Sequence, residues 1–316
     1  MSAILEINAV SKKYSNHLAL NNVSLSIPQG SVFGLLGPNG AGKTSLIRII
    51  TQITGPDTGE IFFKGEKLAQ KHVEKIGYLP EERGLYKKMP VGEQAMYLAQ
   101  LKGLSKAEAK KRLNYWFEKF EMQSWWKKKI EELSKGMQQK VQFIVTILHE
   151  PELLILDEPF SGFDPINAQI IKNEILELRK KGATIIFSTH NMGSVEELCD
   201  NIALLNKSEK ILDGTVKEIR KTFRTNTFKI SFEGNILGFT NTLWAGREIL
   251  EKHSERELHH VTLKLLNNAT ANQLLDAILP TCKIHSFNEV VPSMNDIFIM
   301  KVSEENAAGT KSNFTE

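Results

Sequence analysis

The stretch of sequence that decides the fold runs Gly37-Pro38-Asn39-Gly40-Ala41-Gly42-Lys43-Thr44, and Ser45 follows it directly. This stretch matches the pattern G-x-x-x-x-G-K-[ST], which is typical of a phosphate-binding loop. It lies between a short apolar run at 31–36 and a helical pattern at 44–51, and strand, loop and helix is the context that the motif requires. We therefore expect residues 37–45 to bind the phosphates of a nucleotide.

The residue types in this loop suit that chemistry. Glycines let backbone amides face inward around a β-phosphate, and the N-terminus of the following helix adds a favourable dipole. The Lys43 ammonium is placed to reach the β- and γ-phosphates, and the Thr44 hydroxyl is placed to ligate Mg²⁺. The loop thus predicts binding of ATP together with Mg²⁺. A chance glycine turn before a helix is the alternative, and the complete match disfavours it.

Two carboxylates end an apolar run at 153–156, namely Asp157 and Glu158. Such a run with turns at both ends is typical of a buried strand in a parallel sheet, and ligands bind at the carboxyl ends of these strands. We expect Asp157 to hold the Mg²⁺ shell and Glu158 to polarise the attacking water. The alternative is an ordinary strand end with a solvated acidic turn.

A histidine, His190, follows another apolar run at 184–187. A single histidine is more often structural, but its place at a strand's carboxyl end favours contact with a γ-phosphate. Ser134 and Gly136 precede a further helical pattern. Ser134 is a candidate N-cap, and Gly136 would let a backbone amide approach an anion. By themselves these two residues indicate no more than a helix cap.

Apolar patterning along the rest of the chain predicts an α/β fold with further strands and helices. A helical stretch spans 92–120, and the pattern changes near residue 220 into that of a small separate α+β domain with strands, one helix at 271–279 and Thr270 as its N-cap. We expect three parts: residues 1–220 with a helical subdomain at about 90–140, residues 221–303, and a flexible tail at 304–316.

Composition excludes several classes of protein. The 316 residues carry 40 Lys and Arg against 37 Asp and Glu, so the formal net charge of +3 is too small to argue for nucleic acid. The two cysteines, Cys199 and Cys282, exclude a disulfide framework and indicate a reducing compartment. The N-terminus lacks a signal-peptide pattern, and no window approaches the ~18 apolar residues of a membrane helix. The stretch 101–140 is locally basic, either as a solvated helical face or as a surface near anionic lipid.

The order and spacing of the motifs resemble the ATP-binding subunits of ABC transporters over residues 4–220. Besides the loop and the strand ends, the resemblance rests on Tyr78-Leu79-Pro80, Leu133–Met137, Ser161-Gly162-Phe163-Asp164 and Ser188-Thr189-His190. Within that family the chain is most similar to exporter ATPases of the sodium-extrusion and drug-export type. Those proteins carry the sequence found here at 78–86, a Leu-Ser-Lys-Gly-Met signature, and a small C-terminal domain with a helix like that at 296–299.

The resemblance implies a P-loop NTPase fold with a mixed sheet, and roles for matched residues. Tyr14 would stack on adenine, unless it is a core aromatic residue. Ser134 and Gly136 would contact the γ-phosphate of ATP bound to a second copy of the chain, and Asp164 would lie at that dimer interface. The helical insert would touch an integral-membrane permease, so the subunit would lie on the cytoplasmic face of the cell membrane.

Three positions depart from the family pattern. Glu81 stands where glutamine is usual, and we expect it to reach Mg²⁺, unless it faces solvent or the permease. Lys135 and Met137 replace glycine and glutamine in the signature and suit the exporter subgroup. None of these changes removes a residue needed for hydrolysis, so we expect an active ATPase.

Two other functions compete with transport. A soluble ABC-type ATPase acting on ribosomes or nucleic acid usually carries two ATP-binding halves or a long coiled coil, and this chain shows one set of motifs, so no nucleic-acid partner is expected. A small-molecule kinase would need neither the Ser134 signature nor His190. The leading hypothesis is an ATPase subunit that powers an exporter.

Overall fold

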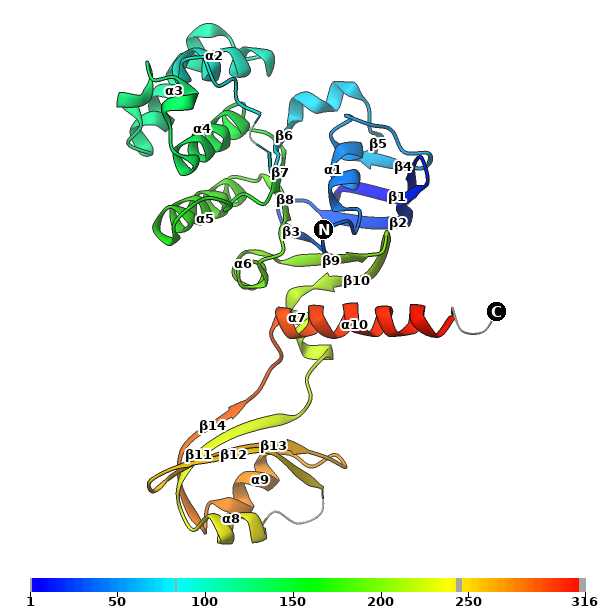
Figure 1. The fold of residues 1–316 in the computed structure, drawn as a ribbon, viewed down its shortest axis with the longest axis vertical. Coiled ribbons are helices and arrows are strands. Elements are labelled where there is room, and N and C mark those ends of the chain that lie inside the picture. Colours follow the sequence, from blue (N-terminus) through cyan, green and yellow to red (C-terminus); the bar gives the residue numbers. More distant parts are fainter. Residues whose placement is uncertain (1, 83, 243–245, 313–316) are drawn as a thin grey trace. The chain divides into compact units, whose positions relative to one another are not determined.

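The computed structural model describes residues 2–82, 84–242 and 246–312. The chain divides into two compact units, Met1–Val216 and Lys217–Glu316 (Figure 1).

The first unit is built on a six-stranded sheet with the strand order β10-β9-β3-β8-β7-β6. The strands are β3 (Val32–Leu36), β6 (Ile76–Leu79), β7 (Leu153–Asp157), β8 (Thr184–Ser188), β9 (Asn201–Asn206) and β10 (Glu209–Thr215). Only β10 is antiparallel to its neighbour, so the sheet is mixed, as expected. Every residue of β3, β7 and β8 is buried, which explains their continuous apolar sequences.

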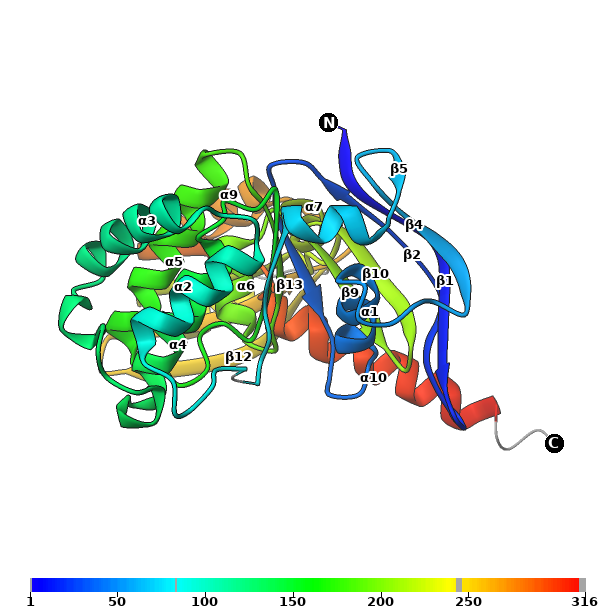
Figure 2. The same ribbon diagram turned by 90° about the horizontal axis from the view of Figure 1, so that it is seen from above.

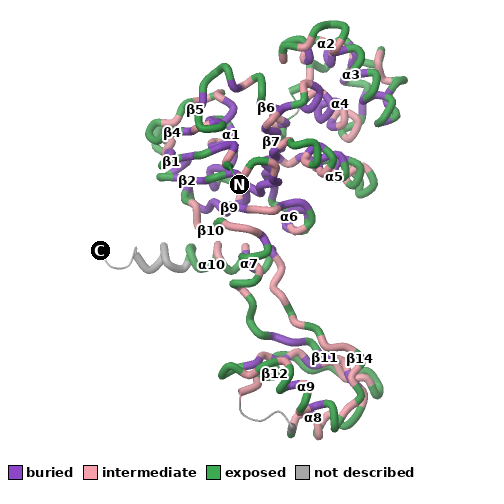
Figure 3. Tube along the Cα trace, turned by 180° about the vertical axis from the view of Figure 1, so that it is seen from behind, coloured by how far each residue is buried: buried purple, intermediate pink, exposed green. Residues whose placement is uncertain are grey.

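A second, antiparallel sheet has the order β2-β1-β4-β5. Its strands are β1 (Ala3–Tyr14), β2 (His17–Pro28), β4 (Thr58–Phe63) and β5 (Glu66–Lys67). Helix α1 (Lys43–Ile50) shares one apolar core with both sheets, and that core includes Ile4 of β1, Leu46 of α1 and Ile155 of β7. Figure 3 shows buried positions along α1 and β7. This core fixes the phosphate loop between the two sheets.

Helices α2, α3 and α4 gather on one side of the first unit, and the antiparallel sheet lies on the other (Figure 2). The helices of this unit are α2 (Val91–Leu101), α3 (Lys106–Lys119), α4 (Lys135–Ile147), α5 (Pro165–Lys180) and α6 (Met192–Leu198), with short 3₁₀ turns η1 (Gln70–Lys75), η2 (Gln123–Trp125) and η3 (Ile130–Glu132). The helical pattern expected over 92–120 is interrupted, because Gly103 has a left-handed φ of 86° and separates α2 from α3.

The second unit has a four-stranded antiparallel sheet in the order β12-β13-β11-β14. Its elements are α7 (Val216–Thr222), β11 (Thr227–Gly234), α8 (Ile236–Thr242), β12 (Arg247–Glu255), β13 (Leu258–Leu265), α9 (Ala271–Ile278), β14 (Cys282–Glu289) and α10 (Met294–Ser312). Helices α8 and α9 lie together on one face of the sheet (Figure 1), and the stacked rings of Phe232 and Phe239 are part of the core there. Thr270 caps α9, as expected, by accepting a hydrogen bond from the Gln273 amide at 3.3 Å.

Two features of this unit were not anticipated from the sequence. Strand β12 was not foreseen, because eight of its nine residues are exposed and leave no alternating pattern. The tail expected to be flexible over 304–316 continues α10 as a helix to Ser312, and residues 313–316 lie outside the described part. Within the described ranges, no helix has both the length and the apolar character needed to cross a membrane.

Candidate active site

The phosphate loop joins β3 to α1 and depends on glycine at particular points. Gly42 is the N-cap of α1 with a left-handed φ of 107°, and a Cβ there would lie 2.4 Å from the Ala19 carbonyl oxygen. A Cβ on Gly37 would lie 2.3 Å from the Leu205 carbonyl oxygen. No side chain caps α1, so its first amides remain available to an anion.

Lys43 lies inside the loop and donates hydrogen bonds to the carbonyl oxygens of Gly37 at 2.7 Å and Pro38 at 3.1 Å. Burial lowers the pKa of Lys43, and the carboxylates of Asp157 and Glu158 oppose that change. The ammonium can exchange these two carbonyl acceptors for phosphate oxygens without leaving the loop.

A cavity of about 230 Å³ joins the loop to the carboxyl edge of the parallel sheet. Its lining consists of His17, Ala19, Asn39, Gly40, Gly42, Lys43, Thr44, Ser45, Glu81, Asp157, Glu158 and His190. The structure therefore brings the loop residues together with the acidic and histidine residues that the sequence placed at strand ends. Gly37 and Pro38 do not line the cavity, but their carbonyl oxygens accept the hydrogen bonds of Lys43. Ala41 is buried and also lies outside the lining.

Glu158 makes several close contacts within this cavity. Its carboxylate accepts hydrogen bonds from the Thr189 hydroxyl at 3.1 Å and the His190 amide at 2.9 Å, and lies 2.6 Å from His190 Nδ1. The Glu158 backbone has a left-handed φ of 47°, a strained conformation for this residue type. The surrounding bonds hold the side chain in one orientation despite that strain.

The carboxylates around Lys43 fit a divalent cation. Asp157 is only 3% exposed, and burial raises its pKa, with Glu81 and Glu158 adding to the effect. Both Glu81 and the Thr44 side chain line the same cavity, so they add oxygen donors. Mg²⁺ is usually held by one or two carboxylates together with substrate phosphates, and this donor set matches that requirement.

The expected site residues at the starts of α4 and α5 lie outside this cavity. Ser134 caps α4, as expected, by accepting a hydrogen bond from the Met137 amide at 3.3 Å. A Cβ on Gly136 would lie 3.3 Å from the Gly162 carbonyl oxygen, and Asp164 caps α5 through the Asn167 amide at 3.0 Å. The starts of α4 and α5 therefore lie near each other, and neither contributes to the lining around Lys43.

Tyr14 ends β1 and is 39% exposed, so the alternative of a core aromatic residue is wrong. The Lys12 ammonium lies 5.5 Å from its ring centre. Tyr14 does not line the cavity, but its cross-strand neighbour His17 does. Sequence reasoning did not identify His17 or Thr189 as site residues. The available signal for His17 was its place in the turn after Tyr14, and that for Thr189 was its position next to His190.

Comparison with known proteins gives the family. Residues 20–161 match the family model described as ABC transporter, and residues 214–302 match that of the C-terminal domain of DrrA1-3-like ATP-binding proteins. The ABC transporter ATP-binding protein YhaQ of Bacillus subtilis is 42% identical over 299 residues, which is 95% of this chain and 98% of YhaQ. This chain belongs to the family of ABC transporter ATP-binding proteins.

Other comparisons agree with this ABC ATPase assignment. The linearmycin resistance ATP-binding protein LnrL of Bacillus subtilis is 30% identical, with 90% of this chain and 92% of LnrL covered. A solved ATP-binding subunit of an ABC transporter is 33% identical, with a TM-score of 0.65, and the match covers 70% of this chain and 93% of that one. The predicted family, the α/β P-loop fold and ATPase activity are thereby confirmed, and the chain is an ATPase subunit of a transporter.

Proposed function

We propose that two copies of this ABC ATPase close head to tail over two ATP molecules and so drive export through an integral-membrane permease. One observation carries the proposal. Glu158 and His190 share a cavity with Lys43, whereas the signature residues Ser134 and Gly136 lie outside it. A chain that carries both halves of a nucleotide site, but keeps them apart, needs a second copy to complete the site.

Within one chain, the loop amides and Lys43 bind the β- and γ-phosphates of ATP. Mg²⁺, held by Thr44, Asp157 and Glu81, would neutralise charge on these phosphates when it is bound. Glu158 accepts a proton from the attacking water, and the Thr189 hydroxyl orients its carboxylate. His190 lies at the same edge and supplies a donor to the γ-phosphate.

The signature segment is suited to act on the partner's ATP. As the N-cap of α4, the Ser134 oxygen accepts a bond from the Met137 amide, so its own proton remains available for donation to a phosphate. Gly136 adds a backbone amide at the positive end of α4. Asp164 begins α5 beside this segment and would lie at the interface between the copies. Tyr14, exposed at the end of β1, would stack on adenine.

A second groove of about 500 Å³ supports docking of a permease on the helical region. Its lining includes the apolar side chains of Tyr78, Leu85, Leu98, Leu101 and Val145. Leu101 is 63% exposed, which favours burial against a partner. The relative LnrL is named for linearmycin resistance, and this supports export as the direction of transport. The subunit would then work on the cytoplasmic face of the membrane.

The second unit, with the proposed domain bounds 221–303, would regulate or dimerise the subunit. It has its own apolar core and contains no nucleotide motif. A chain that ends after residue 220 should keep the ATP affinity of the full chain, measured by titration. A folded truncated chain without nucleotide binding would overturn this assignment.

The experiment for the main proposal uses Glu158→Gln. Removing the base should lower turnover by ~10²-fold or more while ATP still binds. The variant should therefore accumulate as an ATP-bound dimer, seen by size-exclusion chromatography with ATP and Mg²⁺. Glu177→Gln, an exposed change on α5, is the matched control and should stay as active as the unmodified protein. Near-normal turnover in Glu158→Gln, or a monomer with ATP bound, would contradict the proposal.

A further inference from the structure

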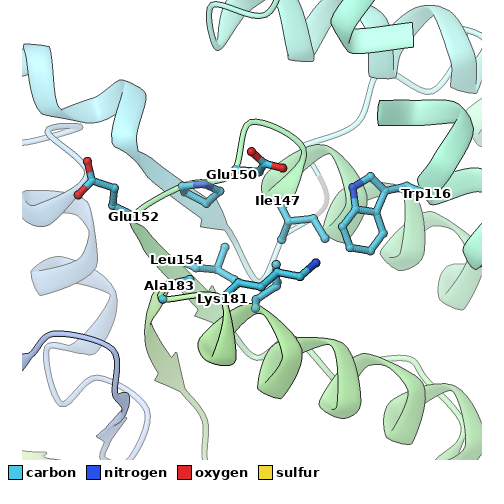
Figure 4. Close-up of a pocket in the computed structure, with 10 residues that line it drawn as sticks. Trp116, Ile147, Glu150, Glu152, Leu154, Lys181 and Ala183 are labelled. Carbon is cyan, nitrogen blue, oxygen red and sulfur yellow. The ribbon is translucent and has the colours of Figure 1, made fainter. Parts of the chain in front are cut away.

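A cavity of about 390 Å³, separate from both the nucleotide site and the groove at Leu98 and Leu101, lies at the other edge of the parallel sheet from the nucleotide site. Leu154, near the start of β7, and Ala183, just before β8, form part of its lining, whereas Asp157 ends β7 (Figure 4). The remaining contacts come from α3, from the end of α4 and the segment 150–152 that follows it, and from the end of α5 and the turn at 181–182. Nothing in ATP binding or hydrolysis uses this cavity.

The inner wall of this cavity is formed by apolar side chains that are almost fully buried. Ile147 and Leu154 are each 1% exposed, and Leu178 of α5 is 8% exposed. The indole of Trp116 stands across the cavity from these residues (Figure 4) and is held in place by α3. A flat apolar group placed here would contact an aromatic ring on one side and aliphatic side chains on the other.

Ion pairs among the described residues engage both carboxylates at the rim of this cavity. Glu150 is paired with Arg112 at 3.1 Å. Glu152 is paired with Lys64 at 2.5 Å and Lys75 at 3.1 Å, and in Figure 4 it points away from the cavity.

Within the described part of the chain, Lys181 forms no ion pair, and its interaction with the Glu177 carboxylate is a longer-range electrostatic one. Its ammonium is directed toward the Trp116 side of the cavity (Figure 4). Both acidic residues of the rim are therefore engaged in ion pairs, although Glu150 shares Arg112 with Glu108, and among the described residues Lys181 is the cation of the lining that has no ion pair of its own.

We propose that this cavity binds a small organic anion with an apolar, ring-containing body. The anionic group, a carboxylate or a sulfonate, pairs with Lys181, and the rings pack between Trp116 and the floor at Ile147 and Leu154. A cavity of this size falls in the range that holds small-molecule ligands. Because Trp116 belongs to α3 and Lys181 follows α5, a bound anion contacts the helical region and the sheet-packed α5 at once.

The probe for this site is anilinonaphthalene sulfonate, whose fluorescence rises in apolar surroundings. The full chain is titrated in saturating ADP, so that the nucleotide cavity is occupied. Lys181→Gln should weaken binding about fivefold, as expected for the loss of one partly exposed ion pair. Lys180→Gln is the matched control, because Lys180 is the preceding residue, pairs with Glu177 at 2.7 Å and does not line the cavity.

A second probe and a second variant separate charge from shape. N-phenylnaphthylamine has the same rings without the sulfonate, so its affinity should be equal in the unmodified protein and Lys181→Gln. Ala183→Leu fills the cavity and should abolish binding of both probes, while a thermal melt and ADP titration check that the variant is folded. Equal sulfonate affinity in the unmodified protein and Lys181→Gln, or unchanged binding in folded Ala183→Leu, would overturn the proposal, as would no binding to the unmodified protein.

Discussion

Helices α1 and α4 begin at the two segments that the sequence singled out for nucleotide binding, and they begin differently. Gly42 starts α1 in a left-handed conformation without a side-chain cap. Ser134 starts α4 with a hydroxyl that accepts the Met137 amide. The first backbone amides of α1 have no side-chain cap and are available to a phosphate. In α4 the Ser134 oxygen accepts one backbone amide, and the Ser134 hydroxyl proton remains available for donation. The comparison teaches that one helix start leaves its backbone amides without a side-chain cap, as the proposed phosphate site of its own chain requires, while the other has a capping hydroxyl that would act on a partner's nucleotide.

The largest expected effect comes from a glycine replacement at the start of α1, compared with the same replacement in the first turn of α4. Gly42→Ala introduces a Cβ against a backbone carbonyl in a left-handed conformation, so ATP affinity should fall by ~10²-fold or more. Gly136→Ala meets its nearest atom at 3.3 Å, so ATP affinity should stay within about twofold while turnover falls. Titration with a fluorescent ATP analogue measures both.

Gly40→Ala is the control within the loop, because its φ of 80° is left-handed but nothing lies within 4 Å of the added Cβ. It should lose less affinity than Gly42→Ala. Equal losses for Gly42→Ala and Gly136→Ala would mean that the two helix starts act on the same nucleotide within one chain.

An intermediate effect is expected from removing caps. Ser134→Ala and Ser105→Ala each remove an N-cap hydrogen bond, from α4 and α3, and each should cost about 1 kcal/mol of unfolding free energy. Only Ser134→Ala should also lower turnover, by ~10-fold or more, because a donor to charged phosphate is lost. Chemical denaturation and an ATPase assay separate the two effects. Similar turnover in the two variants would remove Ser134 from the reaction.

The smallest expected effect concerns Glu81. Its carboxylate adds negative charge to the cavity around Lys43, which opposes ATP unless Mg²⁺ is present. Glu81→Gln should therefore improve metal-free ATP binding by about threefold and flatten the Mg²⁺ dependence. Glu82→Gln, at an exposed neighbour outside the cavity lining, is the control. Identical Mg²⁺ dependence in the unmodified protein and Glu81→Gln would show that Glu81 does not reach the metal.

Sequence reasoning predicted the loop and strand ends well because their signals are local. The apolar runs before Asp157 and His190 indicate buried parallel strands, and such strands end at one edge, which is where the structure places Glu158 beside His190. The contribution of His17 could not be foreseen in the same way. It comes from the antiparallel sheet, and only the packing of that sheet beside α1 brings it to the cavity.

The same limit explains the misses elsewhere. Strand β12 is held by pairing with β13 rather than by burial, so its sequence carries no apolar alternation. For Ser134 the sequence predicted the helix cap, which is local, but the nucleotide it would touch is not encoded near it. When a residue acts on a nucleotide bound to another molecule, its own sequence neighbourhood predicts only its local role, here that of a helix N-cap.

The central claim is that each ATP is held by the phosphate loop of one chain and the signature segment of another. Its most direct test mixes Lys43→Ala chains with Ser134→Arg chains, each of which should be inactive alone. In a mixed dimer one site keeps both Lys43 and Ser134, so equal mixing should restore roughly a quarter of the unmodified activity. Lys43→Ala mixed with the Lys43→Ala/Ser134→Arg double variant has no intact site and should stay inactive. No recovery in the first mixture, with mixed dimers demonstrated by differently tagged chains, would contradict the shared site.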